Sequence, residues 1–406
     1  MDITAPLSGY RVLDFTQFES GTACTETLAW LGAEVWKVER PKWGETGRYS
    51  YDAFGKDTYG FLILNMNKRS VTCDLKTAEG RQLMMRAAGR ADVVVENFGP
   101  GVMERLGLDY DSFKAENPSI IYASIKGFGP DSPYRDYPAF SPIAQSTGGV
   151  AASTGLPDGG PLQPGVNLAD SDAGYMCALS VIAALLQRER TGKGQRCDIA
   201  MQDVMIGLGR SNWEAYYLRG GFGPFRVGNG MPMEPVAPAE MYPCKPFGLN
   251  DYIHIYCSRH VGSRQFEYLC RAIGHEELLD DPRYATPQSR YQNRETLDPV
   301  IAEWTSRHEK QEAMDILCRA GVPAGAVLDF RDLSRDSSLR ESGTLVEVEH
   351  PELGNVLVPG FVPKMSENQV AYRCSPALGA DNDAFYRELL GLTPEEEGAL
   401  REKGVI

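Results

Sequence analysis

The first 200 residues alternate between short apolar runs and segments with apolar residues at helical spacing. Thr22–Ala33 and Thr77–Ala91 have the helical pattern. Strands that alternate with helices pair in parallel through crossover helices, so this order predicts an α/β fold with a parallel sheet. The predicted strands are Tyr10–Phe15, Glu34–Glu39, Ser70–Leu75, Val93–Asn97 and Ile120–Lys126.

A long helix is predicted for Asn167–Arg190, which is apolar on nearly every face between Tyr175 and Leu186. A helix with this pattern is buried in a core or at a subunit interface. After residue 210 the composition changes, and 219–249 is rich in Gly, Pro and Met. The expected parts are a large α/β domain in 1–210, a linker in 211–249, a small α+β domain in 250–330, and a return linker with the C-terminal part of the large domain in 331–406.

The charge balance argues against nucleic acid as a partner. The chain carries 41 Lys and Arg against 55 Asp and Glu, a net charge of −14 over 406 residues, without a basic footprint. The longest strictly apolar run, Val181–Leu186, is far shorter than the roughly 20 residues that span a bilayer. The N-terminus has neither the basic start nor the apolar core of a signal peptide. We therefore expect a cytoplasmic protein that does not bind membranes.

Cysteine and histidine positions exclude several kinds of catalytic site. The nine cysteines include no CxxC pair, so a zinc ribbon or a thioredoxin-type site is not expected. All five histidines lie after residue 250, which excludes a Ser-His-Asp site and a histidine-ligated metal built within the N-terminal part of the large domain, 1–210. Dinucleotide-binding, P-loop and GxSxG motifs are missing too. Chemistry in this domain must therefore use carboxylates, Lys, Tyr, amides or the backbone.

Two aspartates stand where the long helix begins, in the segment 167–174 (NLADSDAG). An Asp at a helix start normally caps free backbone N–H groups, and spacing does not decide between Asp170 and Asp172 for that role. The same position lies at the positive end of the helix dipole, which favours an ionised carboxylate that can act as a nucleophile.

Ordered sequence blocks connect the chain to a known family. The blocks are LSGYRVLDFTQFESGTAC (7–24), LGAEVWKVERP (31–41), NMNKRSVTCDLKTAEG (65–80), ADVVVENFGPGVMERLGLDY (91–110), IYASIKGFG (121–129), RTGKGQRCDIAMQD (190–203) and LLGLTPEEEGALREKGVI (389–406). With these blocks the sequence resembles the class III CoA-transferases, of the formyl-CoA transferase and carnitine CoA-transferase type.

The resemblance implies a fold and a reaction. It implies a Rossmann-like large domain and an interlocked, ring-like dimer of identical or related chains. Asp170 would attack an acyl-CoA, and CoA would pass to a carboxylic acid through aspartyl anhydride and aspartyl-CoA thioester intermediates. Coenzyme A and acyl-CoA are then substrates, with no tightly bound cofactor and no metal.

Coenzyme A carries several phosphate charges, so an acidic protein must offer cations locally. Strand ends and loops of the predicted sheet supply four such residues. By resemblance, Arg40 and Arg105 contact the nucleotide or its phosphates, and Asn97 and Phe98 flank the ligand. The expected CoA-binding residues are Arg40, Lys68, Arg69, Asn97, Phe98 and Arg105.

Gln17, Glu19 and Phe140 are expected on the substrate side. Formyl-CoA transferases have a Gln that matches Glu19, and this extra negative charge would repel a small anionic acid unless it is protonated or paired. Their Gly-rich flap corresponds here to 228–234, which has no Gly run. The aromatic segment 212–225 suggests a larger acyl group, or else core and subunit packing. We expect succinyl-CoA as donor and an aryl- or alkyl-succinate as acceptor.

Two other functions are consistent with parts of the sequence. An α-methylacyl-CoA racemase or epimerase would use a His in the stretch that matches 133–140 (PYRDYPAF), which contains none. A non-catalytic subunit of a heteromeric CoA-transferase would not need Asp170. The missing His and the presence of Asp170 both favour a catalytic transferase.

Overall fold

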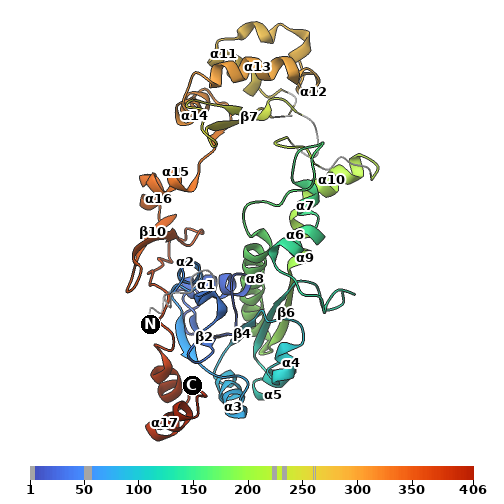
Figure 1. Cartoon of the computed structure of the whole chain (residues 1–406). Coiled ribbons are helices and arrows are strands. Elements are labelled where there is room, and N and C mark those ends of the chain that lie inside the picture. The colour runs from blue at the N-terminus through green and yellow to red at the C-terminus, as the bar shows by residue number, and fades with distance from the viewer. Residues whose placement is uncertain (1–4, 50–56, 222–225, 231–235, 259, 261) are drawn as a thin grey trace. The chain divides into compact units, whose positions relative to one another are not determined.

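The computed structural model describes residues 5–49, 57–221, 226–230, 236–258, 260 and 262–406. The chain divides into two compact units, shown in Figure 1. The first unit comprises 1–150, 164–208 and 338–406, and the second comprises 151–163 and 209–337. The long segment of the second unit is therefore inserted between parts of the first.

The first unit contains a parallel six-stranded sheet in the order β3-β2-β1-β4-β5-β6. Five of these strands confirm the α/β prediction from the sequence, whereas β6 was not predicted. The strand order changes direction between β1 and β4, and ligands of open α/β sheets bind at this switch point, beyond the carboxyl ends of the strands. The strands are β1 (Arg11–Asp14), β2 (Glu34–Glu39), β3 (Arg69–Thr72), β4 (Val93–Glu96), β5 (Ile121–Lys126) and β6 (Gln195–Ala200).

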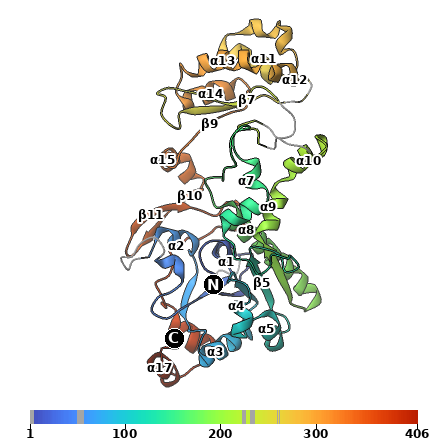
Figure 2. The same cartoon turned by 45° about the vertical axis from the view of Figure 1, so that its right-hand side comes forward.

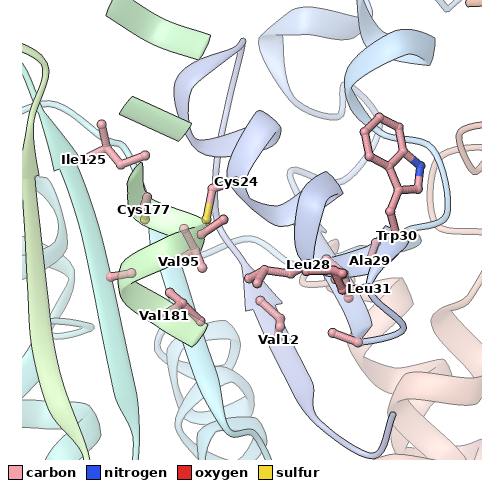
Figure 3. Packing of buried hydrophobic residues seen from close by; sticks show 14 of the residues in the cluster. Val12, Cys24, Leu28, Ala29, Trp30, Leu31, Val95, Ile125, Cys177 and Val181 are labelled. Carbon is pink, nitrogen blue, oxygen red and sulfur yellow. The ribbon is translucent and has the colours of Figure 1, made fainter. Parts of the chain in front are cut away.

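Helices cover both faces of this sheet, and consecutive strand residues alternate between the two faces. Val12 belongs to the core formed with α1 and α8, whereas Leu13 belongs to the core formed with α3 and α5. Figure 3 shows Cys24 and Leu28 of α1 beside Cys177 and Val181 of α8. The helices of this unit are α1 (Ser20–Trp30), η1 (Thr46–Arg48), α2 (Tyr59–Leu64), α3 (Ala78–Ala88), α4 (Val102–Leu106), α5 (Tyr110–Glu116), α6 (Ser141–Thr147), α8 (Leu168–Thr191), α9 (Met201–Leu208), α16 (Ser337–Glu341), the π-helical segment η4 (Ala384–Leu389) and α17 (Pro394–Glu402).

Helix α8 confirms the long helix predicted from the sequence, but only one side of it is buried in this single chain. Its buried stripe of mostly small residues packs on α1 and the sheet. By length and composition α8 is the one helix of the described residues that could cross a membrane, and these contacts account for the apolar residues on its buried side. Its other side exposes Tyr175, Met176, Leu179 and Leu186.

A glycine allows α1 and α8 to approach closely. A Cβ atom on Gly174 would lie 2.6 Å from the carbonyl oxygen of Ser20 and 2.8 Å from the Cβ of Ala23. Any larger residue at 174 would push the two helices apart. The close contact brings the N-terminal ends of both helices together at one edge of the sheet (Figure 2).

The C-terminal segment returns to the first unit. Strand β10 (Leu345–His350) pairs with β11 (Gly354–Pro359) in an antiparallel hairpin. Beyond the hairpin, the rings of Phe385 and Trp36 lie 5.1 Å apart, and the Tyr386 hydroxyl donates to the Thr72 carbonyl at 2.6 Å. The end of the chain therefore completes the core beside β2 and β3.

The second unit has its own antiparallel three-stranded sheet and core. It includes residues 151–163 and all of 211–249, the segment for which the sequence predicted a linker. Despite its many Gly and Pro residues, that segment contains most of α10 and the strand β7, whose Ala239 and Tyr242 pack inward. The elements are α7 (Val150–Ser153), α10 (Arg210–Leu218), β7 (Ala239–Pro243), β8 (Tyr252–Tyr256), α11 (Gln265–Ile273), η2 (Glu276–Leu279), η3 (Pro282–Tyr284), α12 (Pro287–Gln292), α13 (Arg294–Thr305), α14 (Lys310–Arg319), β9 (Ala324–Ala326) and α15 (Phe330–Arg335).

Candidate active site

The loops at the switch point are joined by the side chain of Asn97, which follows β4. Its Oδ1 accepts from the Gln17 backbone N–H at 2.8 Å. Its Nδ2 donates to the Gln17 carbonyl at 2.8 Å and to Ser20 Oγ at 3.0 Å. Asn97 therefore lies at the expected edge of the sheet, where its amide holds the loop between β1 and α1 in place.

That loop ends at Glu19, which contacts the first turn of α8. The two carboxylate oxygens of Glu19 accept hydrogen bonds from Asn167 Nδ2 at 2.7 Å and from Ser171 Oγ at 2.6 Å. These donors bracket Asp170 in the sequence. Asn167 and Ser171 are not among the site residues expected from the sequence. Only their position near Asp170 along the chain could have indicated them.

Asp170 lies partly buried in the first turn of α8. Within the described part of the chain its carboxylate has no hydrogen-bond partner, and Asn167 occupies the N-cap position without a side-chain cap bond. The capping interpretation of Asp170 and Asp172 is therefore wrong. A partly exposed carboxylate without a structural partner is available for chemistry.

The environment of Asp170 favours its neutral form. Burial, and then the negative charge of Glu19, raise the pKa of Asp170 to about 7. The expectation that the helix dipole keeps this carboxylate fully ionised is therefore wrong near neutral pH. A pKa close to the working pH is typical of catalytic carboxylates.

Two of the expected cations remain available to a ligand. Arg40 is exposed directly after β2, where its Nη2 bonds the Tyr49 hydroxyl. Arg105 is exposed on α4, which follows β4. Phe98 is partly buried after β4 and packs on the core that contains α3 and α5. Arg40 and Phe98 come shortly after strands on the two sides of β1, toward the edge where ligands of such sheets bind, and Arg105 lies on the helix after β4.

Lys68 and Arg69 are not placed as expected of phosphate ligands. The buried Lys68 ammonium lies 2.8 Å from Asn65 Oδ1, 3.1 Å from the Thr22 carbonyl and 3.2 Å from Asp14 Oδ2. Arg69 stacks on the ring of Trp36 and lies 3.6 Å from Glu34. We therefore withdraw both from the candidate CoA-binding residues.

The remaining candidates on the substrate side are only partly described. Gln17 Oε1 accepts from Thr46 Oγ1 at 3.2 Å, and Phe140 is exposed at the start of α6. In the second unit, Trp213, Tyr216 and Tyr217 form a row of ring contacts on α10. Residues 222–225 of the aromatic segment and 231–234 of the expected flap lie outside the described residues.

Comparison with known proteins identifies the family of the chain. The model of CoA-transferase family III matches residues 7–382. Formyl-CoA:oxalate CoA-transferase from Rhodopseudomonas palustris (strain HaA2) is 38% identical over 422 residues, covering 100% of this chain and 98% of the relative. The enzyme of that name from Streptomyces avermitilis is 38% identical over 414 residues, covering 100% of both.

A solved structure supports the same assignment. The crystal structure of a CAIB/BAIF family protein from Brucella suis matches with a TM-score of 0.82 and 34% identity, covering 95% of this chain and 99% of that one. The chain that carries this parallel sheet is thus a CoA-transferase. The chain is a member of CoA-transferase family III, which confirms the resemblance found in the sequence.

Proposed function

We propose that Asp170 is the nucleophile that carries CoA from an acyl-CoA donor to a carboxylic acid. The observation that supports this most is the position of Asp170 on the first turn of α8. Its carboxylate is partly buried and unpartnered among the described residues, and it stands beside the loop that Asn97 anchors. Arg40 and Arg105 are exposed cations that would bind the phosphates of the nucleotide.

The reaction needs only carboxylates and thiolates. A carboxylate oxygen of Asp170 attacks the thioester carbonyl, and CoA leaves as a thiolate, which gives a mixed anhydride. The thiolate then attacks the aspartyl carbonyl, releasing the donor acid and forming an aspartyl-CoA thioester. The acceptor carboxylate attacks this thioester, which releases the CoA thiolate and forms a second anhydride between the acceptor and Asp170. The thiolate finally attacks the acceptor carbonyl of this anhydride. Acyl-CoA leaves and the Asp170 carboxylate is restored.

The start of α8 also supplies what the charged intermediates need. The first N–H groups of a helix have no intrahelical acceptor and point along the helix axis toward its start. Such N–H groups stabilise the oxyanion of each tetrahedral intermediate. The proposal therefore gives the first turn of α8 both the nucleophile and part of the oxyanion site.

The proposed assembly is a dimer of identical or related chains. Support comes from the exposed apolar side chains of α8, which include Leu179 at 59% and Leu186 at 60% exposure. A subunit interface over this side would remove them from water and account for a helix that is apolar on nearly every face.

Two substrate pairs follow from different lines of support. The names of the relatives favour formyl-CoA and oxalate. The resemblance seen in the sequence favours succinyl-CoA with an aryl- or alkyl-succinate. Formyl-CoA and succinyl-CoA are therefore the first donors to test.

Trapping with hydroxylamine tests the nucleophile. The purified protein is mixed with formyl-CoA or succinyl-CoA and then with hydroxylamine, and its peptides are analysed by mass spectrometry. An activated carboxylate becomes a hydroxamate, which we expect on Asp170 and not on Glu19 or Asp172. Protein treated with hydroxylamine alone is the blank. An unmodified Asp170 in protein that binds both donors would contradict the proposal, and exchange of an α-proton would then favour a racemase.

The pH profile should report Asp170 directly. Attack requires the ionised carboxylate, and the pKa of this group is about 7. In the free enzyme, kcat/KM should therefore fall about ten-fold for each pH unit below 7 and level off above it. Initial rates between pH 5 and 9 at constant ionic strength measure this. A profile that stays flat down to pH 5 would contradict the assignment.

A further inference from the structure

We infer that Glu19 makes this enzyme select acceptor acids with a single carboxylate over short dianions such as oxalate. The inference rests on the proposed function, because it concerns the acid that meets Asp170, and of the two proposed substrate pairs it disfavours the one that contains oxalate. It assigns Glu19 a role in specificity, whereas Asp170 performs the chemistry.

The Glu19 carboxylate is fixed beside the nucleophile. Its two oxygens are bonded to Asn167 and Ser171, at 2.7 and 2.6 Å, and both donors belong to the helix start that carries Asp170. The backbone of Glu19 is fixed as well, because the loop before it is held by Asn97. These hydrogen bonds therefore hold the Glu19 carboxylate in place when a substrate binds.

No cation compensates this charge within the described residues. Both partners of Glu19 are neutral, and no Lys, Arg or His there forms an ion pair with it. Asp172 is a neighbouring acid, because burial first, and then charges that include Asp172 and Glu19, raise the pKa of the Tyr175 hydroxyl. Burial, and then the negative charge of Glu19, raise the pKa of Asp170, in agreement with the position of Glu19 on the helix turn that carries Asp170.

The acceptor must place one carboxylate against the carbonyl of Asp170. In oxalate the second carboxylate is on the adjacent carbon, so it enters the same acidic surroundings. A monocarboxylate brings a single charge, and that charge passes to the departing CoA thiolate as the new anhydride bond forms. Like charges brought together in a partly buried site strongly disfavour binding. Succinate, with its carboxylates further apart, should fall between oxalate and a monocarboxylate.

Competition between acids tests the inference. With a donor that labels Asp170, kcat/KM is measured for propionate, succinate and oxalate at one pH and ionic strength. These values are compared between the original enzyme and its Glu19→Gln and Glu402→Gln variants. Glu402 is exposed on α17, so Glu402→Gln makes the same change in net charge elsewhere. Glu19→Gln should raise the ratio of oxalate to propionate by about ten-fold, mainly through KM, and Glu402→Gln should leave it unchanged.

A second variant separates charge from structure. Ser171→Ala removes one hydrogen bond to Glu19 but keeps its charge, so it should change the acid ratio less than Glu19→Gln does. An original enzyme that prefers oxalate, or a Glu19→Gln ratio within two-fold of the control, would overturn the inference. If no donor labels Asp170 in any protein, the proposed function itself fails.

Discussion

Replacing Asp170 with alanine should abolish CoA transfer while making the protein more stable at neutral pH. Loss of a covalent nucleophile removes the only route through the anhydride, so kcat should fall by on the order of 10⁴-fold or more. Asp172→Ala is the matched control, since it removes a carboxylate two positions further along α8, and it should keep most of the activity. Asp170→Asn is less suitable, because it could hydrolyse back to Asp.

The stability gain of Asp170→Ala follows from the raised pKa. Below the unfolded value of 3.8 both states hold the proton, so Asp170 has no effect there. Between 3.8 and about 7 the unfolded chain releases the proton and the folded protein retains it, so the original enzyme loses stability as pH rises. Above pH 7 the alanine variant should be more stable by about 1–3 kcal/mol. Thermal unfolding of the original enzyme and the Asp170→Ala variant at pH 4 and pH 8 measures this. If the two proteins had equal melting temperatures at both pH values, the prediction would be contradicted.

Replacing Lys68 with methionine should have the largest effect on stability. Lys68 and Asp14 are fully buried and lie 3.2 Å apart, and Lys68 lowers the pKa of the Asp14 carboxyl against the effect of burial. Without Lys68, Asp14 loses a closely paired cation in the core. A broken buried pair of this kind costs about 3–5 kcal/mol, which should lower the midpoint of urea unfolding clearly.

Two controls decide the role of Lys68. Lys193→Met removes an exposed lysine and should leave the midpoint unchanged. The double variant Asp14→Asn with Lys68→Met should regain part of the loss, because the buried charge is then gone. If Lys68→Met raised the KM for acyl-CoA and left the unfolding midpoint unchanged, Lys68 would be a ligand for CoA after all.

The sequence predicted most of the sheet because its strands are short apolar runs separated by helical patterns. Strand β6 was not predicted because it is an edge strand that carries charged residues, Arg196 and Asp198, which pair with each other. Asp170 could be found through the family resemblance, but its environment could not. Glu19 and Ser171 are 152 positions apart and meet only because α1 and α8 pack side by side.

The errors at the site have one physical origin. Sequence position showed that Lys68 precedes a strand, but not that its side chain runs into the core toward Asp14. It also placed Asp170 at a helix start, where a favourable dipole was expected. Burial and the neighbouring Glu19 instead raise the pKa of Asp170 to about 7. Both properties depend on the distance to groups that are remote in sequence.

The return of the C-terminal segment has a consequence for synthesis of the protein on the ribosome. A nascent chain that has emerged as far as residue 337 has all six strands of the parallel sheet. It still lacks Phe385, Tyr386 and Ile406, which fill the core beside Trp36. One apolar face therefore stays partly uncovered while the whole inserted unit is translated. Chaperones that bind exposed apolar surface have their longest opportunity during that interval.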